Sequence, residues 1–97
     1  MNGYFFSEKA RQDIGEIWLY IAEDSINHAD RLREEFEAAG ELLAEHPGIG
    51  HTRNDLTRLP VRFWPVGVYL VIYHPDTRPI EIVRILHGQR DLPSILG

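Results

Sequence analysis

The chain has 97 residues, of which 43% are hydrophobic and 26% charged, and its formal net charge is −5. This is the length of one small domain, 1–97, and the composition argues against a disordered or membrane-spanning protein. Cysteine is absent, which excludes disulfides and thiolate metal sites, and the N-terminus has no signal-peptide pattern, so we expect a cytoplasmic protein without cofactors.

The charge is divided unevenly along the chain. Residues 1–48 carry eleven acids and four bases, a net charge of −7, whereas residues 49–97 carry four acids and six bases, a net charge of +2. Nucleic-acid backbones are bound mainly by lysine and arginine, so an acidic protein is a poor general nucleic-acid binder. We expect no direct sequence-specific nucleic-acid binding, although a local arginine patch could still contact a nucleic acid.

The first half of the sequence predicts a strand followed by two helices. Aromatic residues 4–6 favour a short strand, and Ser7 has the chemistry of a helix N-cap. Apolar residues at helical spacing predict one helix that ends near residues 24–25 and a second from about Asn27 to the His46–Gly50 turn. So short a break predicts an antiparallel hairpin. Gly15 and Gly40 lie inside these helices, where each costs about 1 kcal/mol relative to alanine unless close packing requires it.

The second half predicts a loop and three strands. Residues 51–59 are polar, residues 62–64 favour a short strand, and residues 68–74 and 80–86 are clear strands joined by a turn, which predicts an antiparallel pair. Strict alternation along the last strand places one set of side chains on one face, Ile80, Ile82, Arg84 and Leu86, and the other set on the opposite face, Glu81, Val83, Ile85 and His87. The predicted fold class is therefore α+β, with a two-helix hairpin packed on a small antiparallel sheet in the order β-α-α-β-β-β and a short C-terminal helical turn.

The end of the last strand carries the most informative cluster of polar residues. It leads into His87, Gly88, Gln89, Arg90 and Asp91, and a rigid strand end is a usual support for binding or catalytic groups. The alternative is that these residues only pair with their neighbours and fix the C-terminal tail.

Four stretches of the chain resemble one family when taken together. They are residues 13–24, 42–50, 62–73 and 82–92, and they include the sequences Glu-Ile-Trp-Leu-Tyr-Ile-Ala and Arg-Ile-Leu-His-Gly-Gln-Arg-Asp. In this order they resemble the ParE branch of the RelE/ParE toxins of type II toxin-antitoxin pairs. Val68 and His74 depart from the pattern, because many relatives have a basic residue at such positions.

The resemblance implies a toxin that binds a cellular target, and DNA gyrase is the leading candidate for that target. It also implies that a cognate antitoxin, either of the ParD type or with another DNA-binding domain, neutralises the toxin in a hetero-oligomer. For contact with the target we select four residues of the C-terminal corner: Arg84, His87, Arg90 and Asp91. For contact with the antitoxin we select helix residues that are otherwise expected in the core: Ile14, Trp18, Ile21, Leu32 and Phe36.

Two other functions remain open on the sequence. A ribosome-dependent messenger RNA endonuclease of the RelE type could use His87 or Tyr73 as acid or base and Arg62, Arg84 or Arg90 as the cation. The second open function is that of a family relative that binds an antitoxin but is not toxic. The histidines have no metal-ligand spacing, so we expect no metal site.

Overall fold

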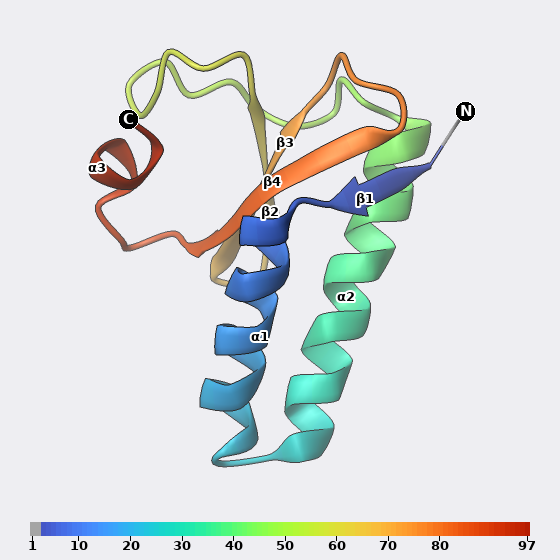
Figure 1. Cartoon of the computed structure of the whole chain (residues 1–97), viewed down its shortest axis with the longest axis vertical. Helices are drawn as coiled ribbons and strands as arrows, with labels where there is room; N and C mark the ends of the chain where they lie inside the picture. The colour runs from blue at the N-terminus through green and yellow to red at the C-terminus, as the bar shows by residue number, and fades with distance from the viewer. Residues whose placement is uncertain (1–2) are drawn as a thin grey trace.

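A computed structural model describes residues 3–97 of the chain, and Figure 1 shows a helix pair beside a twisted sheet. The element order is the predicted strand, two helices, three strands and a short last helix. The bounds are β1 Tyr4–Phe6, α1 Glu8–Ala22, α2 Ile26–Glu45, β2 Arg62–Val66, β3 Tyr69–His74, β4 Ile80–His87 and α3 Leu92–Leu96. The predicted α+β fold class and element order are confirmed.

The two long helices begin at serine caps. Ser7 Oγ accepts a hydrogen bond from the Ala10 N–H at 3.0 Å, and Ser25 Oγ accepts one from the His28 N–H at 3.1 Å. The Ser7 hydroxyl also donates to the Val83 carbonyl at 2.9 Å, which ties the start of α1 to β4. Only residues 23–25 separate the helices, so α1 and α2 form the predicted antiparallel hairpin (Figure 1).

The sheet has the strand order β1-β4-β3-β2. The β2–β3 and β3–β4 pairs are antiparallel, as predicted, but β1 pairs with β4 in parallel through Tyr4–Ile80, Phe5–Glu81 and Phe6–Ile82. The expectation of a wholly antiparallel sheet is corrected for this one pair. Strands β2 and β4 must run in the same direction because two antiparallel steps connect them, whereas the direction of β1 depends on how the helix hairpin returns the chain to the sheet.

A bulge in β4 corrects the predicted alternation of its side chains. Ile72 pairs with Arg84 and Tyr73 pairs with Ile82, so Val83 is an extra residue in β4. Beyond the bulge the faces are exchanged relative to strict alternation. Ile85 therefore joins Ile80 and Ile82 in the core under the helices, and Leu86 belongs to the core on the other face.

Apolar clusters cover both faces of the sheet. The larger cluster packs α1 and α2 against it, and its fully buried members include Phe36, Leu43, Val71, Tyr73 and Ile82. The second cluster lies on the opposite face, where Leu92 of α3 packs with Val61, Phe63, Ile72 and Leu86. Figure 1 shows α3 apart from the helix pair. Because β3 and β4 are buried from both sides, their ends are held rigidly. None of the helices within residues 3–97 has the length and apolar character needed to cross a bilayer.

Candidate functional site

A groove of about 590 Å³ lies where α1 meets the end of β4, and we call it the C-terminal groove. Helix α1 provides one wall, and the β2–β3 turn and the residues after β4 provide the other. The lining residues are Asp13, Glu16, Ile17, Tyr20, Ile21, Val68, Tyr69, Ile85, Leu86, His87 and Arg90. Of the four residues selected for target contact, the structure brings His87 and Arg90 into this groove.

His87 is a half-buried residue of the groove lining. Its ring packs edge-on against Tyr69 with 5.5 Å between ring centroids, and its Nδ1 atom accepts a hydrogen bond from the Gln89 N–H at 3.1 Å. Since Nδ1 is an acceptor, the neutral ring carries its proton on Nε2. Burial also raises the pKa of the Tyr69 phenol. The bulge places His87 on the face covered by α1, whereas strict alternation predicts the opposite face.

Arg84 and Asp13 form a forked ion pair beside the groove. The Arg84 Nε and Nη2 atoms donate to the two Asp13 oxygens at 2.8 and 2.9 Å, and the Ile85 N–H also donates to Asp13 at 3.0 Å. The Asp13 side chain is 8% exposed and that of Arg84 is 21% exposed. Hydrogen bonding to Asp13 raises the pKa of the Arg84 guanidinium. Arg84 therefore holds α1 against β4, and the two N–H groups that bind Asp13 are not available to a target.

The sequence-based selection did not include Asp13. A signal for it exists, because Asp13 lies three residues after Ala10 and four before Ile17, on the buried side of an otherwise apolar helix. An acid at such a position predicts a buried cation partner.

Arg90 and Asp91 have different environments. The Asp91 carboxylate accepts a hydrogen bond from the Ser94 hydroxyl at 2.7 Å, and its backbone carbonyl accepts from the Ile95 N–H at 3.2 Å, so Asp91 fixes α3. The Arg90 side chain is exposed and forms no hydrogen bond or ion pair within residues 3–97. Asp91 therefore fixes the C-terminal tail, as one of the two interpretations of the sequence proposed. The Arg90 guanidinium, in contrast, is available to a partner at the groove.

Two exposed apolar side chains of the groove were missed at the sequence level. Tyr20 is 71% exposed and Val68 is 61% exposed, although both are large enough to be expected in a core. Tyr20 lies outside the apolar stripe of α1, and Val68 lies in the turn before β3, so periodicity gave no reason to select either. They make the rim of the groove apolar next to the Arg90 cation.

The residues selected for antitoxin contact are divided by the fold. Leu32 and Phe36 are 9% and 1% exposed in the core under the helices, so in this structure they offer almost no surface to a partner. Ile14, Trp18 and Ile21 are half-buried. The Trp18 indole N–H donates to Asp30 at 2.9 Å, which orients its ring along the hairpin.

Ile14 and Trp18 also line a shallow hollow on the outer side of the hairpin, about 430 Å³ in volume. We call it the helix-face hollow. Its other lining residues are Arg11, Gly15, Leu19 and Arg33, and Leu19 is 65% exposed. Large apolar groups between two arginines leave this face suited to a partner helix.

The residues considered for RNA cleavage do not converge. The Tyr73 hydroxyl donates to the Pro47 carbonyl at 2.6 Å and accepts from the Gly50 N–H at 2.9 Å, and burial raises its pKa. Arg62 donates to the Gly50 carbonyl at 2.8 Å. His87 pairs with Tyr69, which is four residues or about 13 Å along β3 from Tyr73. Tyr73 and Arg62 thus hold the loop after α2, far from His87.

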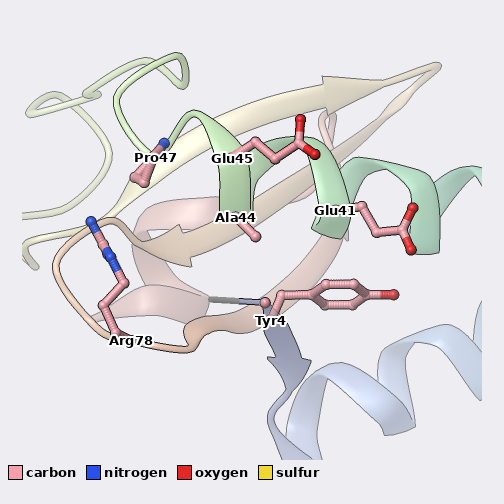
Figure 2. A pocket seen from close by; sticks show the side chains of 7 residues that line it. Tyr4, Glu41, Ala44, Glu45, Pro47 and Arg78 are labelled. Carbon is pink, nitrogen blue, oxygen red and sulfur yellow. The ribbon is translucent and has the colours of Figure 1, made fainter. Parts of the chain in front are cut away.

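Another hollow, of about 970 Å³, lies between β1 and the end of α2 and contains none of the selected residues. Figure 2 shows Tyr4, Glu41 and Glu45 on its walls, with Arg78 at one end. Burial, and then the charges of Glu37 and Glu41, raise the pKa of Tyr4. Among residues 3–97, three or more histidine, aspartate or glutamate side chains do not gather in a way that could hold a metal ion.

Comparison with known proteins gives consistent matches over nearly the whole chain. Residues 4–92 match a family profile described as the ParE toxin of the type II toxin-antitoxin system parDE. Toxin ParE1 of Caulobacter vibrioides is 33% identical over 98 residues, and the match covers all of both chains. A solved structure of the chromosomal ParDE toxin-antitoxin system from P. aeruginosa has a TM-score of 0.72 with 18% identity, and the match covers 90% of this chain and 96% of that one.

Proposed function

Because the chain belongs to the ParE toxin family of type II toxin-antitoxin systems, we propose that it inhibits growth by binding DNA gyrase and is neutralised by a cognate antitoxin. We further propose that residues 1–97 act as one toxin domain in the cytoplasm. The observation that carries the proposal is the C-terminal groove, where a free cation adjoins exposed apolar side chains on a rigid support.

The groove has the chemistry of a protein-binding site. Arg90 and Tyr20 belong to the residue types that dominate binding energy at protein interfaces, and Val68 adds apolar area beside them. The Arg84–Asp13 pair fixes the two walls relative to each other, so the groove does not need to be ordered on binding. In this proposal His87 and Arg90 contact the target, while Arg84 and Asp91 position them.

The helix-face hollow is our candidate for the antitoxin contact. Ile14, Trp18 and Leu19 offer an apolar strip, and Arg11 and Arg33 flank it. An antitoxin helix with an apolar side and acidic flanks would match both features. Ile21 belongs to the C-terminal groove as well as to the packing of the helices, so an antitoxin that reaches it would also cover the target site. Leu32 and Phe36 have no part in this surface.

A binding mechanism is preferred to messenger RNA cleavage because cleavage requires an acid, a base and a cation around one phosphate. Tyr73 and Arg62 are bonded to the backbone of the loop at residues 47–50, and Arg84 is bonded to Asp13. Of the residues nominated for cleavage, only His87 and Arg90 therefore lie in one site, and the nominated set does not surround one phosphate. The carboxylate of Glu16 and the phenols of Tyr20 and Tyr69 also line that groove, so the assay below includes messenger RNA.

Two assays run side by side test the proposal. The purified chain is added to a gyrase supercoiling reaction and to an in vitro translation reaction in which messenger RNA length is followed. Inhibited supercoiling with intact messenger RNA supports gyrase binding. Cleaved messenger RNA would instead establish the endonuclease, and no effect in either reaction would identify a relative that only binds antitoxin.

The Arg90→Ala variant tests the site. We expect inhibition of supercoiling at least about tenfold weaker, because an exposed arginine that anchors an interface contributes at least about 1.4 kcal/mol. Binding to the antitoxin should be almost unchanged. The matched control is Arg31→Ala, which removes the same charge from an exposed position on α2. Equal loss of gyrase inhibition and antitoxin binding in Arg90→Ala would contradict the division between the two surfaces.

A further inference from the structure

Three arginines from three separate segments surround a hollow of about 550 Å³ at the end of the molecule that holds the loop after α2. We call it the arginine hollow. Arg58 comes from the loop before β2, Arg62 from β2 and Arg78 from the β3–β4 turn. Asp76 is the one carboxylate among the lining residues, and Thr52 and Asn54 add neutral polar groups. We infer that this hollow binds successive phosphate groups of a nucleic-acid backbone.

Two of the three guanidinium groups, those of Arg62 and Arg78, are oriented by hydrogen bonds without being neutralised. Arg62 donates to the Gly50 carbonyl at 2.8 Å, and Arg78 donates to the Pro75 and Thr77 carbonyls at 2.8 and 2.7 Å. These acceptors carry no charge. The ion pairs within residues 3–97 involve only Arg33, Arg53 and Arg84 among the arginines. The three cations of the hollow therefore keep their full charge and further N–H donors for a ligand.

Carboxylates near the hollow do not cancel this charge. Glu41 and Glu45 line the neighbouring hollow that also contains Arg78. Figure 2 shows the Arg78 guanidinium directed toward Pro47, with both carboxylates pointing away from it. Pro47 and Arg78 line both hollows, so they form the boundary between them. Among the residues that line the arginine hollow, Asp76 is therefore the one negative charge that opposes the three arginines.

A phosphodiester backbone fits this arrangement for two reasons. Its phosphates are regularly spaced single charges, so cations carried by three different segments can each meet one. The guanidinium fork also suits phosphate oxygens better than an ammonium does. Contacts of this kind carry no base information, which agrees with an acidic protein that does not read sequence. The inference does not depend on gyrase being the target.

The salt dependence of binding has a definite expected size. Each neutralised phosphate of duplex DNA contributes about −0.9 to the slope of log affinity against log salt concentration. Three contacts give a slope of about −2.7, which is a loss of affinity of about 40-fold between 50 and 200 mM salt. Two contacts give about −1.8, or about 12-fold over the same range.

The experiment measures fluorescence anisotropy of a labelled DNA duplex titrated with the full chain at several salt concentrations. We expect Arg58→Ala to bind more weakly at every salt concentration and to have a slope less steep by about 0.9. Arg58 is exposed and its side chain makes no hydrogen bond within residues 3–97, so this variant should fold normally. Asp76→Asn, which removes the opposing charge, should bind more tightly than the wild type. Arg31→Ala is the control with the same loss of charge far from the hollow.

The outcomes separate a site from diffuse attraction. A weaker Arg58→Ala, a tighter Asp76→Asn and a nearly unchanged Arg31→Ala support the inference. Equal weakening by Arg58→Ala and Arg31→Ala would overturn it, as would absence of duplex binding by the wild type at 50 mM salt. Pyrophosphate is the second probe: binding of pyrophosphate that depends on Arg58, without binding of the duplex, would show a small-anion site and would also overturn the nucleic-acid assignment.

Discussion

Replacing Gly40 by alanine should destabilise the protein, whereas the same replacement at Gly15 should stabilise it. Both glycines lie inside long helices, where alanine is favoured over glycine by about 1 kcal/mol. A Cβ atom at Gly15 would have no neighbour within 4 Å. Gly15→Ala should therefore gain most of that 1 kcal/mol, which corresponds to a rise of about 4–8 °C in the unfolding midpoint of a domain of this size.

At Gly40 the ring of Tyr4 occupies the space that the methyl group would need. A Cβ atom there would lie 2.5 Å from two carbons of the ring and 2.8 Å from its Cγ atom. Carbon atoms in contact are usually about 3.5–4.0 Å apart, so the ring or the helix must move by about 1 Å. Figure 2 shows the ring lying under α2. Overpacking of this kind costs about 1–3 kcal/mol, which equals or exceeds the helix gain of about 1 kcal/mol.

The assay is thermal or urea unfolding of the two variants beside the wild type. We expect Gly15→Ala to be more stable than Gly40→Ala by about 1–3 kcal/mol, a difference of at least about 4 °C in the midpoint. In a Tyr4→Ala background the penalty at Gly40 should disappear, and Gly40→Ala should become stabilising. The reasoning would be refuted if Gly40→Ala raised the midpoint of the otherwise wild-type protein as much as Gly15→Ala does.

Three further variants test the site and its support. Asp13→Ala should lower the free energy of unfolding in urea by about 2–4 kcal/mol, because it leaves the Arg84 guanidinium without its partner; Asp55→Ala, which breaks an exposed ion pair, should have no measurable effect. Tyr73→Phe should cost about 1–3 kcal/mol through two lost hydrogen bonds. Because burial raises the pKa of Tyr73 above 10.0, its contribution is complete below pH 10 and is lost at higher pH, so the wild type should lose more stability than Tyr73→Phe when the pH is raised above 10. Tyr20→Ala should weaken gyrase inhibition without a change in the unfolding midpoint, since the side chain is 71% exposed; a lowered midpoint would show that Tyr20 supports the fold instead.

Much of the candidate site could be located from the sequence, but the roles within it could not. The corner after β4 is recognisable because a hydrophobic strand runs directly into His87 and Arg90, and both lie in the C-terminal groove. The other wall of the groove comes from α1, about seventy residues earlier in the chain. Nothing in the local sequence around Tyr20 or Asp13 relates them to residues 84–90. The ion pair between Arg84 and Asp13 was therefore not predictable from the spacing of residues along the chain.

The sequence by itself determined the local elements and the family. Ser7 and Ser25 cap their helices, the apolar spacing defines a two-helix hairpin, and the turn between β3 and β4 forces an antiparallel pair, because each of these depends on residues close together in the chain. The four stretches that resemble ParE toxins likewise agree with the family match over residues 4–92.

Only the tertiary structure decided which side of the sheet each β4 residue faces and which helix glycine is required. A bulge at Val83 exchanges the faces of Ile85 and Leu86 relative to strict alternation, and a bulge arises from pairing with β3, which no alternation pattern in β4 contains. Gly40 is required because the ring of Tyr4, in β1, packs against it. Gly15, in contrast, has open space where a Cβ atom would lie. Such contacts join residues distant in sequence, so their energies enter only when the chain has folded.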